Sequence, residues 1–234
     1  MIKKVIFISI LCLSGAIFAA SEKAGEVKPL PKGDPVRGEK LVGSCAACHG
    51  ADGNSLVGMW PTLAGQRELY LFDQLHHIQE GERVIESMMG LLDGYNDDDL
   101  RDMAAYYASQ KIKVGQASDE NVLLGQTIYR AGNAASGLPA CTGCHGPQGK
   151  GVNSAGYPAL GGQKAEYVVT SLVAYKNKTR GNGEEEGLVM QNVASMLTIE
   201  EIQAVANYVS GCLLYTSDAA DEGLGVDLGG RRII

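Results

Sequence analysis

Two short stretches of the 234-residue chain have residue types and spacing that could do chemistry, and both follow the pattern Cys-x-x-Cys-His. The first consists of Cys45, Cys48 and His49, and the second of Cys141, Cys144 and His145. Two thiols three positions apart can each form a thioether with one vinyl group of the same porphyrin, and the next residue, a histidine, is then held under the iron as its proximal ligand. The pattern therefore predicts two covalently bound haem c groups. A four-cysteine zinc site is the alternative, but it does not require a histidine after the second cysteine in both stretches.

The two motifs are 96 positions apart (45 to 141), which favours two domains of about 90 to 100 residues. We expect the first domain at 21–113 and the second at 114–211. Domains of this size bury limited apolar surface by themselves, so a covalently attached haem would supply part of each core. The segment 111–120 is polar, lacks apolar periodicity and is interpreted as the linker.

The N-terminal segment has the pattern of a secretory signal peptide. Lys3 and Lys4 precede an apolar run from Val5 to Phe18, and Ala19 and Ala20 supply small residues for cleavage. The apolar run is short for a membrane span. We therefore expect export to the periplasm, with 1–20 removed by cleavage near Ala19 or Ala20 (an uncleaved anchor being the alternative). This agrees with the motifs, because c-type haem is attached on the outer side of the bacterial inner membrane.

The C-terminal stretch Cys212 to Ile234 resembles a translated sequencing adapter of the transposon type. It begins where the internal repeat described below ends. We hypothesise that 212–234 is an assembly artefact, and genomic DNA that continues through this stretch would contradict the idea. The four cysteines of the haem motifs are then the ones that remain in the mature chain, and no disulfide is needed.

The elements that must position the motifs form an internal repeat, which runs from about Pro35 to Gln110 and again from about Val122 to Gly211. Each copy reads helix, haem loop, helix, methionine loop and closing helix, without a convincing strand pattern. The opening helices share a glycine, which costs stability inside a helix; a close crossing with another helix would explain it. The closing helices start at Asn96 and Thr198, each with an acid three residues later. We predict an all-α fold.

The net charge of the chain argues against nucleic acid as a partner. The formal net charge is −7 at pH 7, so nucleic-acid binding is not expected. Haem propionates would make the surface more acidic still.

The sixth iron ligand must come from elsewhere in each half, and methionine is the candidate. The first half offers Met59, Met88, Met89 and Met103, and the second offers Met190 and Met196. Met103 lies in the closing helix and is interpreted as core, while Met59 is too near the attachment loop to reach the opposite haem face easily. Spacing alone barely separates Met88 from Met89.

The motifs and the repeat resemble class I c-type cytochromes, and the resemblance to the dihaem cytochrome c4 family is closer. The similarity covers about Asp34 to Gly211, and four segments carry it: 45–55, 63–66, 139–145 and 160–163. It implies two tandem class I cytochrome c domains, each a small helical fold around one haem, packed face to face in the periplasm.

The resemblance also implies roles for single residues. It places the methionine ligands at Met88 and Met190, so that His49 and Met88 bind one iron and His145 and Met190 bind the other. It places the carbonyls of Pro61 and Pro158 on the outer ring nitrogen of each proximal histidine, where a hydrogen bond fixes the ring and raises its basicity. Tyr70 and Tyr167, which match in the repeat, are candidates for the haem edges, the domain interface or core packing. His76 and His77 have no histidine counterparts in the second half and are interpreted as ordinary helix residues.

Two classes of function remain open. The first is a soluble carrier of single electrons between respiratory-chain partners, with an upstream quinol-oxidising complex as donor and a membrane-bound terminal oxidase as the expected acceptor; peripheral association with the membrane is left open. The second is an enzyme or enzyme subunit, either a dihaem peroxidase or the haem subunit of a sulfide-oxidising flavocytochrome or another periplasmic oxidoreductase complex. A peroxidase needs an iron with a displaceable ligand, whereas each half here offers a methionine. A flavin would require a partner chain.

Overall fold

The structure is a computed structural model that describes residues 32–181 and 185–211. The expected signal peptide (1–20) and the adapter-like stretch (212–234) lie outside the described residues. No helix within the described part is long and apolar enough to span a membrane.

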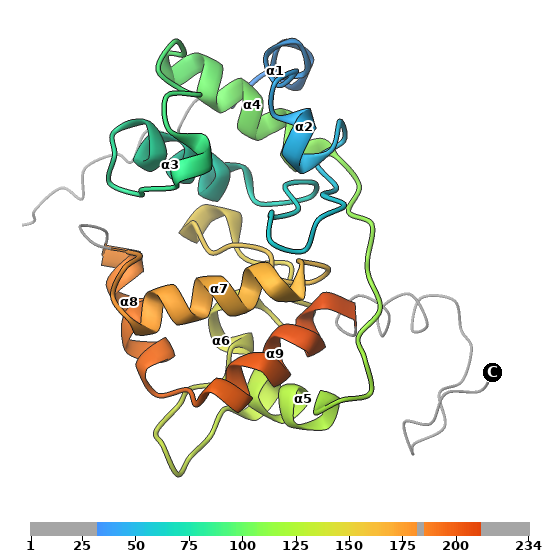
Figure 1. The fold of residues 1–234 in the computed structure, drawn as a ribbon, viewed down its shortest axis with the longest axis vertical. Coiled ribbons are helices and arrows are strands. Elements are labelled where there is room, and N and C mark those ends of the chain that lie inside the picture. Colours follow the sequence, from blue (N-terminus) through green and yellow to red (C-terminus); the bar gives the residue numbers. More distant parts are fainter. Residues whose placement is uncertain (1–31, 182–184, 212–234) are drawn as a thin grey trace, which may run out of the picture. The chain divides into compact units, whose positions relative to one another are not determined.

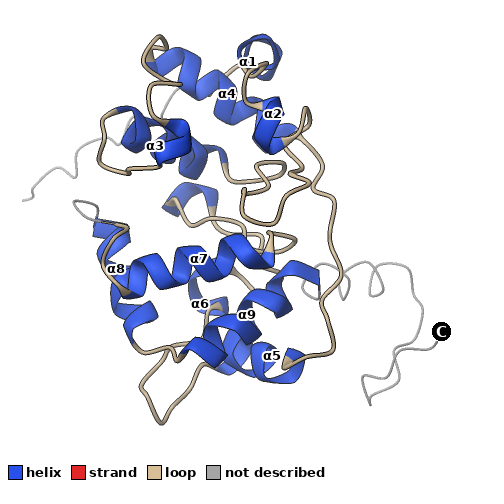
Figure 2. Ribbon diagram, in the orientation of Figure 1, coloured by secondary structure: helices blue, strands red, loops and turns tan. Residues whose placement is uncertain are grey.

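Helices of two halves make up the described chain (Figures 1 and 2). The first half contains α1 (Pro35–Leu41), α2 (Ala46–His49), α3 (Glu68–Gln79), the 3₁₀ turn η1 (Glu86–Met88) and α4 (Asp97–Ser109). The second half contains α5 (Val122–Ala131), α6 (Thr142–His145), the 3₁₀ turn η2 (Asn153–Ala155), α7 (Ala165–Lys176), α8 (Glu185–Ser195) and α9 (Ile199–Gly211). Apart from two isolated bridges, the described residues form no β-structure, which confirms the predicted all-α fold.

A glycine in the opening helix of each half allows that helix to cross the closing helix closely. A Cβ added at Gly38 in α1 would collide with the backbone carbonyl of Asp102 in α4 and lie 2.9 Å from the Cβ of Tyr106. A Cβ added at Gly125 in α5 would collide in the same way with Ala204 and Tyr208 of α9. The close crossing predicted from the shared glycine is therefore present twice.

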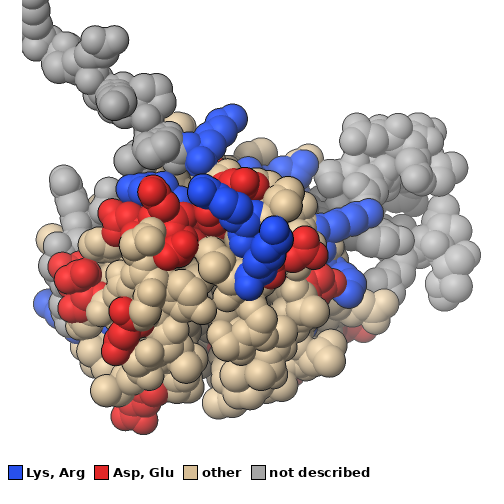
Figure 3. Space-filling model, turned by 90° about the horizontal axis from the view of Figure 1, so that it is seen from above, with Lys and Arg blue, Asp and Glu red and all other residues tan. Residues whose placement is uncertain are grey.

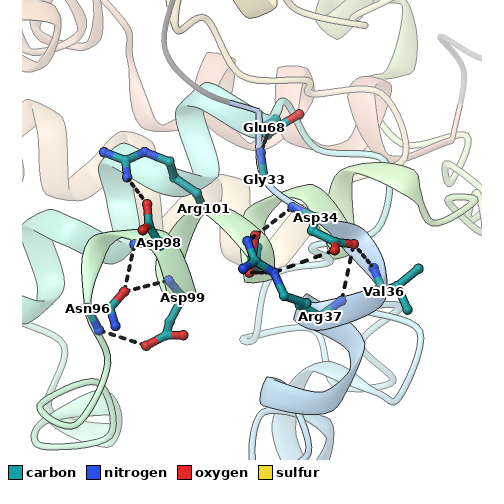
Figure 4. Close-up of polar contacts among 10 residues, drawn as sticks. Gly33, Asp34, Val36, Arg37, Glu68, Asn96, Asp98, Asp99 and Arg101 are labelled. Carbon is teal, nitrogen blue, oxygen red and sulfur yellow. Dashed lines mark hydrogen bonds and ion pairs between the residues drawn. The ribbon is translucent and has the colours of Figure 1, made fainter.

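Capping side chains fix the ends of α1 and α4 (Figure 4). Asp34 accepts hydrogen bonds from the first turn of α1, and its own N–H donates to the buried carboxylate of Asp102, 2.6 Å away. Arg37 forms an ion pair with the same carboxylate at 2.8 Å. At the start of α4, Asn96 and Asp99 form the predicted capping box. Thus α4 is fixed at its start, and Asp102 ties it to α1.

The second closing helix begins with the same kind of cap. The Thr198 hydroxyl accepts from the backbone N–H of Glu201, and the Glu201 carboxylate accepts from the backbone N–H of Thr198, at 3.1 and 2.8 Å. The sequence predicted this cap from the acid three residues after the threonine.

Each half has its own apolar core, built mainly on the closing helix. In the first half Leu100 and Met103 of α4 are essentially inaccessible and pack with Leu71 of α3. In the second half Ile202 of α9 packs with Tyr129 of α5. Met103 is therefore core, as predicted.

The methionine segments of the two halves differ, and the prediction of a loop in each half is wrong for the second. Met88 ends the single turn η1, whereas Met190 lies inside the eleven-residue helix α8. The second half has the longer spacing between histidine and methionine (145 to 190, against 49 to 88). The longer segment contains the helix α8, which packs against the second half. The Ala194 side chain is fully buried, and Gln191 donates to the carbonyl of Arg180 at 2.8 Å.

The linker is fixed at both ends by asparagine side chains. Asn54 donates to the carbonyl of Lys111 and accepts from the N–H of Lys113, at 3.0 and 2.7 Å. Asn207 of α9 accepts from the N–H of Ser118 at 2.8 Å and donates to its carbonyl at 2.9 Å. The chain between the halves is thus held against each half in turn.

Candidate haem sites

Each Cys-x-x-Cys-His motif forms one tight helical turn. In the first half this turn is α2, in which the N–H of His49 donates to the carbonyl of Cys45 at 3.0 Å. Gly50 ends the turn with φ +80°, a conformation that glycine adopts without strain. Cys141, His145 and Gly146 repeat this arrangement at α6, with the same distance and φ +78°. The turn places both thiols of a motif and its histidine on one short element.

Three of the four motif thiols are partly buried, and the fourth, that of Cys144, is exposed. Cys45 and Cys141 are partly buried against the apolar core of their own half, while Cys144 is exposed. All four thiols are free. Among the described residues, no three histidine, cysteine or acidic side chains lie close enough to hold a metal ion, so the four cysteines do not form a zinc site.

Both motif histidines are buried and oriented by a proline carbonyl. The Nδ1 atom of His49 lies 2.9 Å from the carbonyl oxygen of Pro61, and that of His145 lies 3.0 Å from the carbonyl oxygen of Pro158. A carbonyl oxygen only accepts, so Nδ1 carries the proton and Nε2 keeps its lone pair. Burial lowers the pKa of both imidazoles, although the hydrogen bond acts in the opposite direction. Each ring is therefore neutral at pH 7 and its Nε2 is a potential iron ligand.

The loops that carry the two prolines are held by equivalent backbone bonds. In the first half the carbonyl of Gly53 accepts from the N–H groups of Leu63 and Ala64, at 2.7 and 3.1 Å. In the second half the carbonyl of Gly149 accepts from Leu160 and Gly161, at 2.7 and 3.0 Å. The N–H groups of Gly65 and Gly162 then tie each loop to the carbonyls of Tyr107 and Val209 at the closing helix. The repeat is thus preserved in the groups that position the histidines.

The candidate methionine ligands within each half differ in burial. Met88 is partly buried and packs against the first core, whereas the neighbouring Met89 is 70% exposed. In the second half Met190 is partly buried and Met196 is 38% exposed. Met88 and Met190 are therefore the less exposed methionines of the two pairs.

Two arginines and two tyrosines interlock the halves. Arg180 donates to the hydroxyl of Tyr70 at 2.8 Å, and Arg83 donates to the hydroxyl of Tyr167 at 3.1 Å. Each bond joins one half to the other, so the interface interpretation of the two tyrosines is confirmed. Both arginines also donate to Gln74 of α3. Neither arginine was predicted from the sequence to have a role.

This cluster carries buried positive charge. Arg180 is 9% exposed, and among the described residues its Nε has no hydrogen-bond partner. Burial opposes ionisation of Tyr167, but the two guanidinium groups outweigh it and hold the pKa of that hydroxyl well below its usual range. A buried cation is stabilised by a nearby negative charge. The cluster therefore fits an anionic group such as the propionate carboxylates of haem.

The two histidines outside the motifs lie beside carboxylates. His76 and His77 of α3 lie beside the carboxylates of Asp97 and Glu82, at 3.9 and 3.6 Å. These contacts agree with their interpretation as ordinary helix residues.

Each half holds a Cys-x-x-Cys-His turn whose histidine is bonded to a proline carbonyl, and this arrangement indicates a dihaem c-type cytochrome. The family model that matches is "Cytochrome c", at residues 35–111 and again at 122–212. Cytochrome c4 from Pseudomonas aeruginosa is 46% identical over 179 residues, 76% of this chain and 89% of that protein. The chain belongs to the cytochrome c4 family.

Two further comparisons support this assignment and extend it. The crystal structure of reduced recombinant cytochrome c4 from Pseudomonas stutzeri matches with a TM-score of 0.74 at 41% identity, over 76% of this chain and 98% of that chain. A protein from Thiomonas intermedia named thiosulfate dehydrogenase electron acceptor is 36% identical over 71% of this chain and 77% of its own length.

Membership of the family establishes the general role of the chain. It has two cytochrome c domains, each of which binds one haem c covalently, and it is an electron-transfer protein. The family is also periplasmic, which agrees with the export predicted from the N-terminal segment.

Proposed function

We propose that the protein carries single electrons through the periplasm from a quinol-oxidising complex to a membrane-bound terminal oxidase, with both irons closed by histidine and methionine. His49 and Met88 bind one iron, and His145 and Met190 bind the other. The thiols of Cys45, Cys48, Cys141 and Cys144 supply the thioethers. The signal segment is removed near Ala19 or Ala20.

The observation that supports this ligation most strongly is the pair of oriented histidines. Each ring directs its protonated Nδ1 to a proline carbonyl, so Nε2 is the atom available to iron. Met88 is the partly buried member of its pair, and Met190 is less exposed than Met196. His–Met ligation raises the potential of c-type haem and leaves no open position for a substrate. This favours a carrier over a peroxidase.

The bound haem supplies the one-electron couple, and the chain's own residues hold it. The carbonyls of Pro61 and Pro158 keep each histidine oriented and basic, while Arg83 and Arg180 supply positive charge for the propionates. These cations also hold the two halves together, which favours fast exchange between the haems.

Exposed apolar side chains beside the first motif offer a docking surface for redox partners. Leu56, Val57 and Met59 follow the first motif and are 95%, 41% and 56% exposed. On the face shown in Figure 3, side chains of both charge signs lie together next to uncharged surface. Small contact areas are typical of weak electron-transfer encounters.

Replacement of the methionines tests the ligation. Met88→Ala or Met190→Ala should open one iron to carbon monoxide in the ferrous state and lower the potential of that haem, because the thioether stabilises ferrous iron. The other haem should stay nearly unchanged. Met89→Ala and Met196→Ala are the matched controls and should leave both haems closed. If a control variant opens an iron instead, the assignment in that half is wrong; if none does, the ligation is not His–Met.

Stopped-flow mixing tests the electron route. The reduced protein should be oxidised rapidly by membranes that contain a terminal oxidase, and the oxidised protein should be reduced by the quinol-oxidising complex. Failure of both reactions would contradict the respiratory role.

A second candidate function follows from the relatives. The similarity to the thiosulfate dehydrogenase electron acceptor, and to thiosulfate dehydrogenase from Marichromatium purpuratum (30% identity, TM-score 0.67, 75% of this chain and 40% of that chain), favours a role in accepting electrons from a periplasmic sulfur-oxidising enzyme. Rapid reduction by such an enzyme with thiosulfate, and slow reduction by the quinol-oxidising complex, would favour this function over the first.

A further inference from the structure

A glutamine from each half binds the loop that orients the histidine of the other half. The side chain of Gln163 accepts from the N–H of Thr62 at 2.8 Å and donates to the Thr62 carbonyl at 2.9 Å. In the reverse direction, Gln66 accepts from the N–H of Ala159 and donates to the Ala159 carbonyl, at 2.6 and 2.9 Å. The two contacts are equivalent in the repeat, and each crosses from one half to the other.

The peptide groups that bind the glutamines are the same ones that bind the proximal histidines. The N–H of Thr62 and the carbonyl of Pro61 belong to one peptide group, which we name the first proximal peptide. Its carbonyl accepts from His49 Nδ1, and its N–H donates to Gln163. The second proximal peptide, which joins Pro158 to Ala159, lies between His145 and Gln66 in the same way. Each histidine is thus the start of a hydrogen-bond chain that ends in the opposite half.

Both glutamines are held rigidly and away from water. Gln66 is 7% exposed and Gln163 is 6% exposed. The Oε1 atom of each glutamine also accepts from the next backbone N–H, that of Arg67 or Lys164, at 2.8 and 2.9 Å. Since backbone N–H groups can only donate, the side-chain oxygen must face them, and the orientation of each amide is fixed. In a buried environment such a chain of hydrogen bonds is strengthened by mutual polarisation.

We propose that Gln66 and Gln163 are positioning residues that set the potential of the haem in the opposite half. A hydrogen bond donated by a peptide N–H increases the negative charge on the carbonyl oxygen of the same group, which then binds the histidine Nδ1 proton more strongly. The imidazole becomes a more basic ligand and stabilises ferric iron. Gln163 therefore lowers the potential of the His49 haem, and Gln66 lowers that of the His145 haem. The inference rests on the proposed ligation by these two histidines.

The test replaces each glutamine by methionine, which keeps the length of the side chain and removes the amide. Gln163→Met should raise the potential of the His49 haem more than that of the His145 haem, although Gln163 belongs to the second half. Gln66→Met should have the reverse effect. Potentials are measured in the full-length holoprotein by a redox titration in which the two haems are followed separately by their NMR signals.

A second measurement reads the proposed chain directly. In the diamagnetic ferrous protein, the Nδ1 proton of His49 should shift upfield in Gln163→Met, because its hydrogen bond weakens, while that of His145 stays in place. Gln163→Glu keeps an oxygen that accepts from Thr62, so the His49 proton should stay at its original position or move downfield, and not upfield. If Gln163→Met does not fold, Gln66→Met and Gln163→Glu still test the same chain.

The matched control removes a bond between the halves that does not involve a proximal peptide. Asn153 accepts from the N–H of Leu69 at 3.2 Å, so Asn153→Ala loosens the same interface without touching either histidine chain. It should change neither potential. Equal shifts of both haems in Gln163→Met, or an unmoved His49 proton, would overturn the proposal. That failure is distinct from a failure of the ligation itself, which would appear in the unaltered protein as an iron without histidine and methionine.

Discussion

The glycine at each helix crossing gives a prediction in which two physical effects have opposite signs. Gly38→Ala should destabilise the first domain. Helix propensity alone would make alanine more stable by about 1 kcal/mol. The added Cβ, however, would collide with the Asp102 carbonyl and lie 2.9 Å from the Tyr106 Cβ, so α1 and α4 must move apart. The sign of the change in unfolding free energy therefore decides between the two effects.

The expected loss of unfolding free energy depends on the kind of atoms that would collide. Overpacking a well-packed contact costs about 1–3 kcal/mol, and a collision with backbone belongs near the upper end because no side chain can rotate away. After subtraction of the helix gain, we expect a net loss of about 2 kcal/mol. For a domain of this size, that lowers the unfolding temperature by about 10 °C.

The assay is urea and thermal unfolding of the holoprotein, with hydrogen exchange of the α4 and α9 amides to show which domain is affected. Gly125→Ala should destabilise the second domain in the same way, because its added Cβ meets Ala204 and Tyr208. Gly43→Ala is the matched control, since nothing lies within 4 Å of its added Cβ. A Gly38→Ala protein that is more stable than the original would refute the close crossing.

Two further predictions concern the second domain and the independence of the halves. The Thr198 backbone N–H holds the pKa of the Glu201 carboxyl below its ordinary value of 4.5, although burial acts the other way. Because its pKa is lowered in the folded state, ionised Glu201 stabilises the folded protein at pH values above its ordinary pKa, and this stability is lost as the pH falls through the folded-state pKa. Glu201→Gln should therefore be less stable than the original protein at neutral pH and equally stable in acid. Urea unfolding at a series of pH values measures this difference. Separately expressed, 21–113 and 114–211 should each fold and bind one haem; the absence of haem from either fragment would contradict two self-contained domains.

The fold could be predicted almost entirely from the sequence because its main determinants are local or repeated. The cap at Asn96 is set by residues three positions apart, and the position of Gly38 inside a helix is costly unless another helix passes close by. The exception is α8. Its helix depends on the burial of Ala194 and on the bond from Gln191 to Arg180, which are tertiary contacts that the local sequence does not reveal.

The attachment motifs were also predictable, because the chemistry of haem attachment dictates their spacing. The hydrogen bonds from His49 to Pro61 and from His145 to Pro158 were expected from the family and are present. The choice of Met88 over Met89 could not be made from spacing alone, because adjacent residues differ only in the direction of their side chains. In the structure Met88 is partly buried whereas Met89 is 70% exposed, which supports the proposal of Met88 as the ligand.

The binding partners of Gln66 and Gln163 could be identified only from the structure. Gln66 and Gln163 appear in the sequence as matching residues of a repeat, and a match alone predicts equivalent positions within each half. It gives no information about which residue each side chain binds. Their partners are Ala159 and Thr62, 93 and 101 positions away, and both partners lie next to a proline that orients a histidine. A repeat whose copies pack against each other places equivalent residues at equivalent points of the partner copy. The same duplication that made the fold predictable therefore also links each histidine to the opposite domain.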